Sequence, residues 1–143
     1  MPSMHLRIHF TLEPNWRTAP WAFWVHVPVA GTATTYMPAA PRAAPHKGFV
    51  FLHVDAAGVD LQFSSLAQLD HFIDVMATRP LPTSLQLSRK RGAPVGPNGH
   101  WLSRLPAKLK TTKARAKLVG RLRTVREQLL PLGDAWHSFA HLL

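Results

Sequence analysis

Lys47–Phe63, with the sequence KGFVFLHVDAAGVDLQF, is the stretch that decides the fold. Its two halves, Lys47–Val54 and Val59–Phe63, are rich in β-branched and aromatic residues, as strands are. Asp55–Gly58 lies between them and ends on a glycine placed for positive φ, which predicts a short turn. The stretch therefore predicts two adjacent strands of an antiparallel sheet.

Two further strands are expected before this pair. Met4–Leu12 alternates between apolar and polar residues, which predicts a half-buried strand. Trp21–Val29 predicts a second strand, with Pro28 at its end or on an edge because proline cannot donate to a ladder. Residues 30–47 are rich in Ala, Thr and Pro and predict a loop.

Helices are expected after the sheet. Ser65–Gln68 has the spacing of a capping box and predicts a helix over 66–79 that covers one face of the sheet. Thr83–Ser88 alternates weakly and is a candidate fifth strand, and His100–Leu105 is a candidate single helical turn. The strongest helix is expected over 111–130, where one stripe holds the apolar residues Ala114, Leu118, Leu122, Val125 and Leu129.

These elements predict an α+β fold: an antiparallel sheet of four to five strands, one packed helix and a long basic C-terminal helix. The 143 residues are expected to form a single domain. The chain contains no cysteine, which excludes disulfides and thiolate metal sites. Its first residues lack the apolar run of a signal peptide, and Trp21–Ala30 is too short to span a membrane. We therefore expect a cytoplasmic protein without a membrane partner.

The net charge of +10 is unevenly distributed. Residues 1–86 form a neutral part with five basic and five acidic side chains, whereas residues 87–143 form a basic part with twelve basic and two acidic ones. A surface of solvating ion pairs would mix both signs, so this excess predicts a polyanionic partner. The expected phosphate-binding residues are Arg89, Lys90, Arg91, Lys108, Lys110, Lys113, Lys117 and Arg121.

Trp101 lies within this basic part and is a candidate for stacking on a nucleic-acid base. The stretch Asn98–Trp101 that contains it is either an active loop carrying His100 or a structural turn anchored by a buried Trp101. Trp24 and His26 also admit two interpretations, because they form either an exposed partner-binding patch or, if a helix covers them, part of the core.

Histidines are the third group of candidate residues. His5 and His9 share one side of the first strand with Arg7 between them, and His26 and His53 occupy the next strands. Two imidazoles and a cation can cleave RNA without a metal, as base, acid and stabiliser of the phosphorane. The alternative is a polar sheet face that meets solvent or a partner.

Several enzyme signatures are absent from the sequence. It has no phosphate-binding glycine loop, no HExxH and no serine nucleophile elbow. Seven carboxylates also make a two-metal nuclease unfavourable. We therefore assign no catalytic residue, no metal ligand and no cofactor.

The stretch Gly96–Lys110, GPNGHWLSRLPAKLK, resembles uncharacterised small proteins of proteobacterial plasmids, phages and integrative elements. The resemblance covers the C-terminal half at most and brings no catalytic residues. It implies an accessory or anti-defence role, such as inhibition of a host CRISPR complex.

The leading hypothesis is a non-enzymatic nucleic-acid-binding accessory protein that uses its basic C-terminal loop and helix. The second is an inhibitor that docks on a host ribonucleoprotein or defence complex, in the manner of an anti-CRISPR protein. The third is a small metal-independent ribonuclease that uses the histidine-bearing sheet face.

Overall fold

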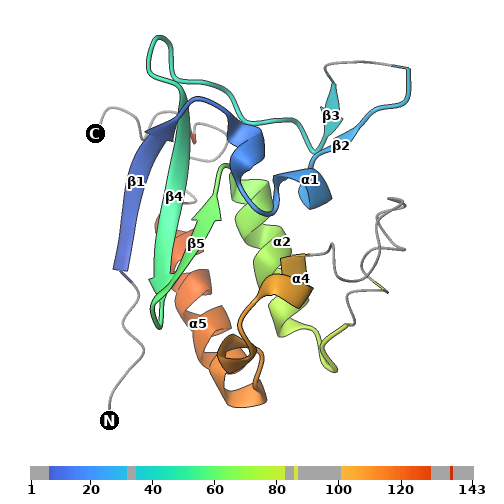
Figure 1. Ribbon diagram of the computed structural model, residues 1–143, viewed down its shortest axis with the longest axis vertical. Helices are drawn as coiled ribbons and strands as arrows, with labels where there is room; N and C mark the ends of the chain where they lie inside the picture. The colour runs from blue at the N-terminus through green and yellow to red at the C-terminus, as the bar shows by residue number, and fades with distance from the viewer. Residues whose placement is uncertain (1–6, 32–34, 83–85, 87–100, 130–135, 137–143) are drawn as a thin grey trace.

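The computed structural model describes residues 7–31, 35–82, 86, 101–129 and 136. These residues adopt an α+β fold in which an antiparallel sheet, ordered β1-β4-β5, packs on helices (Figure 1). β1 (Arg7–Glu13) pairs with β4 (Phe49–Ala56), and β4 pairs with β5 (Val59–Phe63). The predicted pair of strands is therefore a hairpin that supplies the middle and one edge of this sheet.

The turn of this hairpin is formed by Ala57 and Gly58, whose φ angles are both positive, at 52° and 84°. Two-residue turns with this geometry follow the right-handed twist of the strands. Asp55 supports the turn because its Oδ1 accepts a hydrogen bond from the Gly58 backbone N–H at 2.9 Å. The short turn predicted over 55–58 is confirmed.

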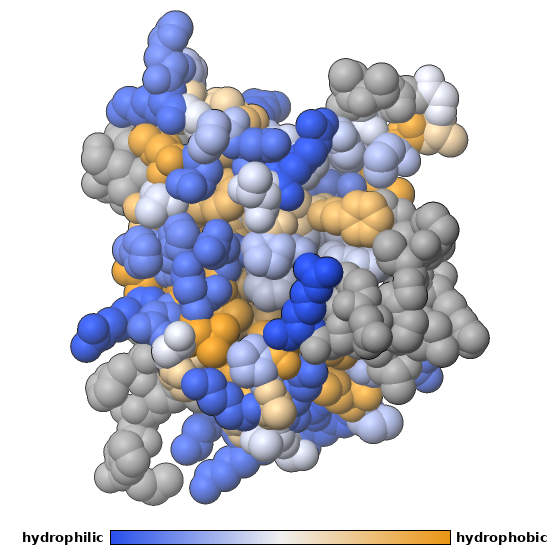
Figure 2. Space-filling view, in the orientation of Figure 1, coloured by the Kyte–Doolittle hydropathy of each residue, from blue (hydrophilic) through white to orange (hydrophobic). Residues whose placement is uncertain are grey.

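The two faces of the sheet differ in what covers them. Val50, Leu52 and Val54 point into the main core, where α2 (Leu66–Ala77) and α5 (Thr112–Leu129) form a helical layer (Figure 1). The opposite face is apolar only at one end, where Phe51 packs on Trp16. Further along β4, this face carries polar side chains, and Figure 2 shows hydrophilic residues gathered over it.

α2 begins at the predicted cap. The Ser65 hydroxyl accepts a hydrogen bond from the Gln68 backbone N–H at 3.2 Å. The Gln68 side chain reaches back one residue further than a standard capping box, because its Oε1 accepts from the Ser64 backbone N–H at 2.9 Å. The helix ends at Ala77 rather than at residue 79, since the approach to Pro80 moves the chain into extended conformation at Thr78.

α5 packs along α2 and confirms the long C-terminal helix. Leu118, Leu122, Val125 and Leu129 of the predicted stripe are buried. Arg126 links the two helices through an ion pair with Asp70, and this contact raises the pKa of the guanidinium. Trp136 lies on the same core, where its Nε1 donates to the Val50 carbonyl of β4 at 2.9 Å.

Trp21–Val29 is not a single strand, which corrects the prediction. The segment follows a short 3-10 turn, η1 (Trp16–Thr18), and folds as α1 (Ala22–Val25) before β2 (Val27–Pro28). Every residue from 21 to 25 is apolar, so alternation did not distinguish strand from helix. β2 pairs with β3 (Tyr36–Met37) in a separate two-stranded ribbon.

The connection from α2 to α5 is described at residues 78–82, at residue 86 and from residue 101 onward. α4 (Trp101–Arg104) and the 3-10 turn η3 (Ala107–Leu109) flank Pro106, which agrees with the predicted single turn ended by proline. The candidate strand Thr83–Ser88 lies outside the described residues apart from Gln86. Within the described part of the chain, no helix is long and apolar enough to cross a membrane.

Candidate functional site

Three cations line one solvent-facing side of α5. Lys113, Lys117 and Arg121 are spaced four residues apart, so they succeed one another on the same face of the helix. All three are exposed, and among the described residues none of them has an ion-pair partner. We call these three residues the basic face. Glu127, the one acid of α5, lies about 80–120° around the helix from Lys117 and Arg121 at 100° per residue.

Two further predicted cations lie just before this helix. Lys108 in η3 is exposed and donates from Nζ to the Ala57 carbonyl in the hairpin turn at 2.8 Å. Lys110 ends η3 and is partly exposed. Thr111 caps α5, since its hydroxyl accepts from the Ala114 backbone N–H at 3.2 Å. The predicted phosphate contacts Arg89, Lys90 and Arg91 lie outside the described residues.

Trp101 is a core residue, and its assignment as a base-stacking residue is corrected. The ring is only 4 % exposed. It packs edge-on against Trp21, with ring centroids 4.9 Å apart, and tilted against Phe72 at 5.3 Å. Its Nε1 donates to His71 Nε2 at 3.1 Å. This burial is what the alternative interpretation expects of an anchoring Trp101, while residues 98–100 of that stretch lie outside the described residues.

Trp24 and His26 do not form an exposed partner-binding patch. His26 is 2 % exposed, and Trp24 is partly buried against the main core. Because the segment turns as a helix rather than running as a strand, His26 points inward between Trp16 and α2. The exposed aromatic ring of this region is that of Phe23, which lies edge-on to Trp24 at 4.9 Å.

An apolar pocket of about 300 Å³ lies beside these aromatic residues. Its walls include Trp21, Trp24 and Trp101, and Asp60 and Arg104 add one charge of each sign. The indole Nε1 of Trp21 is buried and has no hydrogen-bond partner within the described residues.

His26 is held between two partners as a neutral ring. Its Nδ1 lies 3.0 Å from the Pro38 carbonyl, which can only accept, so Nδ1 carries the proton. Nε2 then accepts from the Ser65 hydroxyl at 2.8 Å. Burial lowers the pKa of His26 from its ordinary 6.5, and the hydrogen bond to Pro38 offsets part of this effect. The folded chain therefore takes up this proton less readily than the unfolded chain.

We expect acid to destabilise the protein through His26. Between the lowered pKa and about 6.5, the unfolded chain binds a proton that the folded chain does not, so the free energy of unfolding falls as the pH drops. Above about 6.5 this contribution is fully present. Thermal unfolding from pH 7.5 to 5.0 should show a shallower pH dependence in His26→Asn than in the wild type. His46→Asn, at an exposed site, is the control and should keep the wild-type slope.

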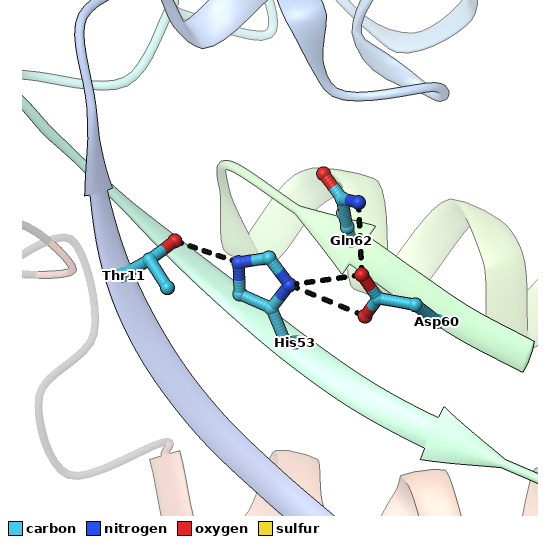
Figure 3. A network of polar contacts seen from close by, with 4 residues as sticks. All are labelled: Thr11, His53, Asp60 and Gln62. Atoms are coloured by element: carbon cyan, nitrogen blue, oxygen red, sulfur yellow. Dashed lines mark hydrogen bonds and ion pairs between the residues drawn. The ribbon is translucent and has the colours of Figure 1, made fainter. Parts of the chain in front are cut away.

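The polar sheet face carries a connected network centred on His53 (Figure 3). His53 Nδ1 donates to the Asp60 carboxylate at 3.2 Å, and its Nε2 is 2.6 Å from the Thr11 hydroxyl. Gln62 donates to the same carboxylate at 2.9 Å. The ring of His9 stacks on that of His53, with centroids 4.5 Å apart and planes 9° from parallel. His9 and His53 therefore meet as expected, whereas His26 lies elsewhere and His5 is outside the described residues.

Both ring nitrogens of His53 have a partner within the described residues, Nδ1 in the Asp60 carboxylate and Nε2 in the Thr11 hydroxyl. Sequence reasoning missed Thr11, Asp60 and Gln62. The signal that locates Gln62 is the hairpin register, which places it directly opposite His53. The described residues contain no group of His, Asp and Glu suited to holding a metal ion.

Comparisons with protein families, with curated proteins and with solved structures found no match for this chain.

Proposed function

We propose that this protein is a non-enzymatic accessory protein that binds the phosphate backbone of a nucleic acid. The observation that carries the proposal is the basic face, where Lys113, Lys117 and Arg121 share one exposed side of α5 and have no ion-pair partner among the described residues. Successive members are separated by about 6 Å along the helix axis, at 1.5 Å per residue. Over the roughly 12 Å of this face a duplex presents several phosphates, so the three cations can contact a backbone together.

Lys108 and Lys110 extend the same region toward the start of α5, which raises the number of candidate contacts among the described residues to five. The backbone N–H groups of the first helical turn add partial positive charge there. None of these groups reads base edges in a groove by itself, so the proposal is for binding that depends on charge more than on base sequence. In this proposal the protein acts in the cytoplasm, where a cysteine-free chain fits the reducing conditions.

The proposal is tested by the salt dependence of binding. If five phosphates are neutralised, the logarithm of the affinity for duplex DNA should fall against the logarithm of salt with a slope of about −4 to −5. Fluorescence anisotropy with labelled oligonucleotides between 50 and 300 mM salt measures it. A slope near zero contradicts phosphate-led binding. Lys47→Gln, at an exposed position before β4, is the matched control and should leave the slope unchanged.

A second candidate is a protein-binding inhibitor of a host ribonucleoprotein or defence complex. It is supported by two exposed apolar side chains, Phe23 at 49 % and Met37 at 70 % exposure. Under this candidate the chain would capture a defined protein complex after nuclease treatment. Under the first proposal, nuclease treatment would release whatever the chain has bound.

A further inference from the structure

Arg115 is a buried cation that has no counter-charge among the described residues. It lies in α5 on the side that faces α2, and the residue is only 6 % exposed. Its Nε is shut off from solvent and has no hydrogen-bond partner within the described residues, and no described carboxylate is within ion-pair distance. By contrast, Arg126 further along the same helix forms an ion pair with Asp70. A buried N–H group without a hydrogen-bond partner is costly, so the burial of Arg115 Nε requires an explanation.

A pocket of about 320 Å³ opens beside Arg115, between the end of α2 and residues 112–123 of α5. Arg79 and Arg123 line it together with Arg115, so three arginines border one cavity. Among the described residues, no acidic side chain takes part in its lining. Thr112, the first residue of α5, also lines the pocket and brings the positive end of the helix to it.

Two small residues of α5 also line the pocket. Ala116 and Gly120 line it, and a Cβ built on Gly120 would meet nothing within 4 Å. At 100° per residue, these two positions separate Arg123 from the basic face around the helix. A ligand in the pocket therefore lies close to the surface on which we propose that nucleic acid binds.

We propose that this three-arginine pocket is a binding site for a phosphate group. Guanidinium groups bind phosphate through paired, parallel N–H···O bonds, and an oxyanion would give Arg115 the partner that the described residues do not supply. A phosphate of a nucleic-acid backbone and free inorganic phosphate share this chemistry. For the backbone, the inference rests on the proposed function and adds one defined phosphate contact to it. For free phosphate, it stands by itself.

The first experiment measures thermal unfolding of the full chain in sodium phosphate and in sodium chloride at equal ionic strength. Phosphate should raise Tm by several degrees in the wild type, as a ligand of the folded state does at many times its Kd. Arg115→Met should abolish this rise, and in chloride it should unfold at or above the wild-type Tm because an unpaired buried charge is gone. Arg123→Met, at an exposed position, should reduce the rise without endangering the fold.

Arg121→Met is the matched control because it removes a cation from the same helix but outside the pocket. It should keep the full phosphate-dependent rise in Tm. The proposal is overturned if phosphate stabilises the wild type no more than chloride does. It is equally overturned if Arg115→Met and Arg123→Met both retain the rise.

Oligonucleotide binding then identifies the source of the phosphate. If inorganic phosphate competes with the oligonucleotide and Arg115→Met makes the salt slope shallower by about one, the pocket holds a backbone phosphate. If Arg115→Met binds oligonucleotides like the wild type while losing the phosphate effect on Tm, the pocket takes free phosphate. A chain that binds no oligonucleotide but keeps the Arg115-dependent rise supports the pocket and contradicts only the proposed function.

Discussion

Replacing Lys113, Lys117 and Arg121 together by glutamate should reduce nucleic-acid affinity by roughly 10²–10³-fold at 0.1 M salt. Each lost phosphate contact makes the salt slope shallower by about one, and near 0.1 M salt one unit of slope corresponds to at most about tenfold in affinity. The new carboxylates also repel the backbone. Anisotropy titrations of wild type and variant across the same salt range measure both the affinity and the slope.

The fold should survive this charge reversal, since all three side chains are exposed and outside the core. Far-UV circular dichroism and Tm check that α5 remains helical. Arg42 and Lys47 are both exposed in the segment before β4. Replacing both by glutamate changes the net charge by four and leaves the basic face intact. If this control loses as much affinity as the triple variant, binding follows total charge and the basic face has no special role.

Replacing Trp101 by alanine should destabilise the protein by about 3–5 kcal/mol, the usual cost of truncating a buried aromatic side chain. The ring fills the space between Trp21 and Phe72, and its removal also leaves His71 without an indole donor. Urea unfolding followed by circular dichroism measures the loss. A domain of ordinary stability keeps only a small part of its free energy of unfolding after such a change.

Trp101→Phe is the matched variant, since it keeps an aromatic ring in the core and removes the hydrogen bond to His71. Trp101→Phe should lower the free energy of unfolding much less than Trp101→Ala does. If Trp101 were instead a base-stacking residue, alanine would lower nucleic-acid affinity while the free energy of unfolding stayed the same. That outcome would restore the assignment that the buried position of the ring contradicts.

The parts of the fold set by local sequence were predictable. The turn at Ala57–Gly58 and the cap at Ser65 need only neighbouring residues, and both form as expected. The segment Trp21–Val25 was not predictable, because five successive apolar residues fit a buried strand and a buried helix equally well. In the helical form, Trp21 packs against Phe63 and Phe72, which lie far along the chain.

The candidate sites also differ in whether local sequence or distant packing determines them. The basic face follows from helical spacing alone, so Lys113, Lys117 and Arg121 were found from the sequence. The burial of Arg115 depends on how α2 lies across α5, which no local pattern contains. His26 was expected on a polar face because the segment was read as a strand, and it is buried because the chain turns there.

Trp136 also bears on how the protein forms during synthesis. Its indole donates to the carbonyl of Val50 in the middle strand, across 86 positions of the chain. A nascent chain therefore lacks this contact until residue 136 has emerged from the ribosome. Up to that point, the apolar surface on which the indole packs is uncovered, and it is there that we expect a chaperone to bind the unfinished protein.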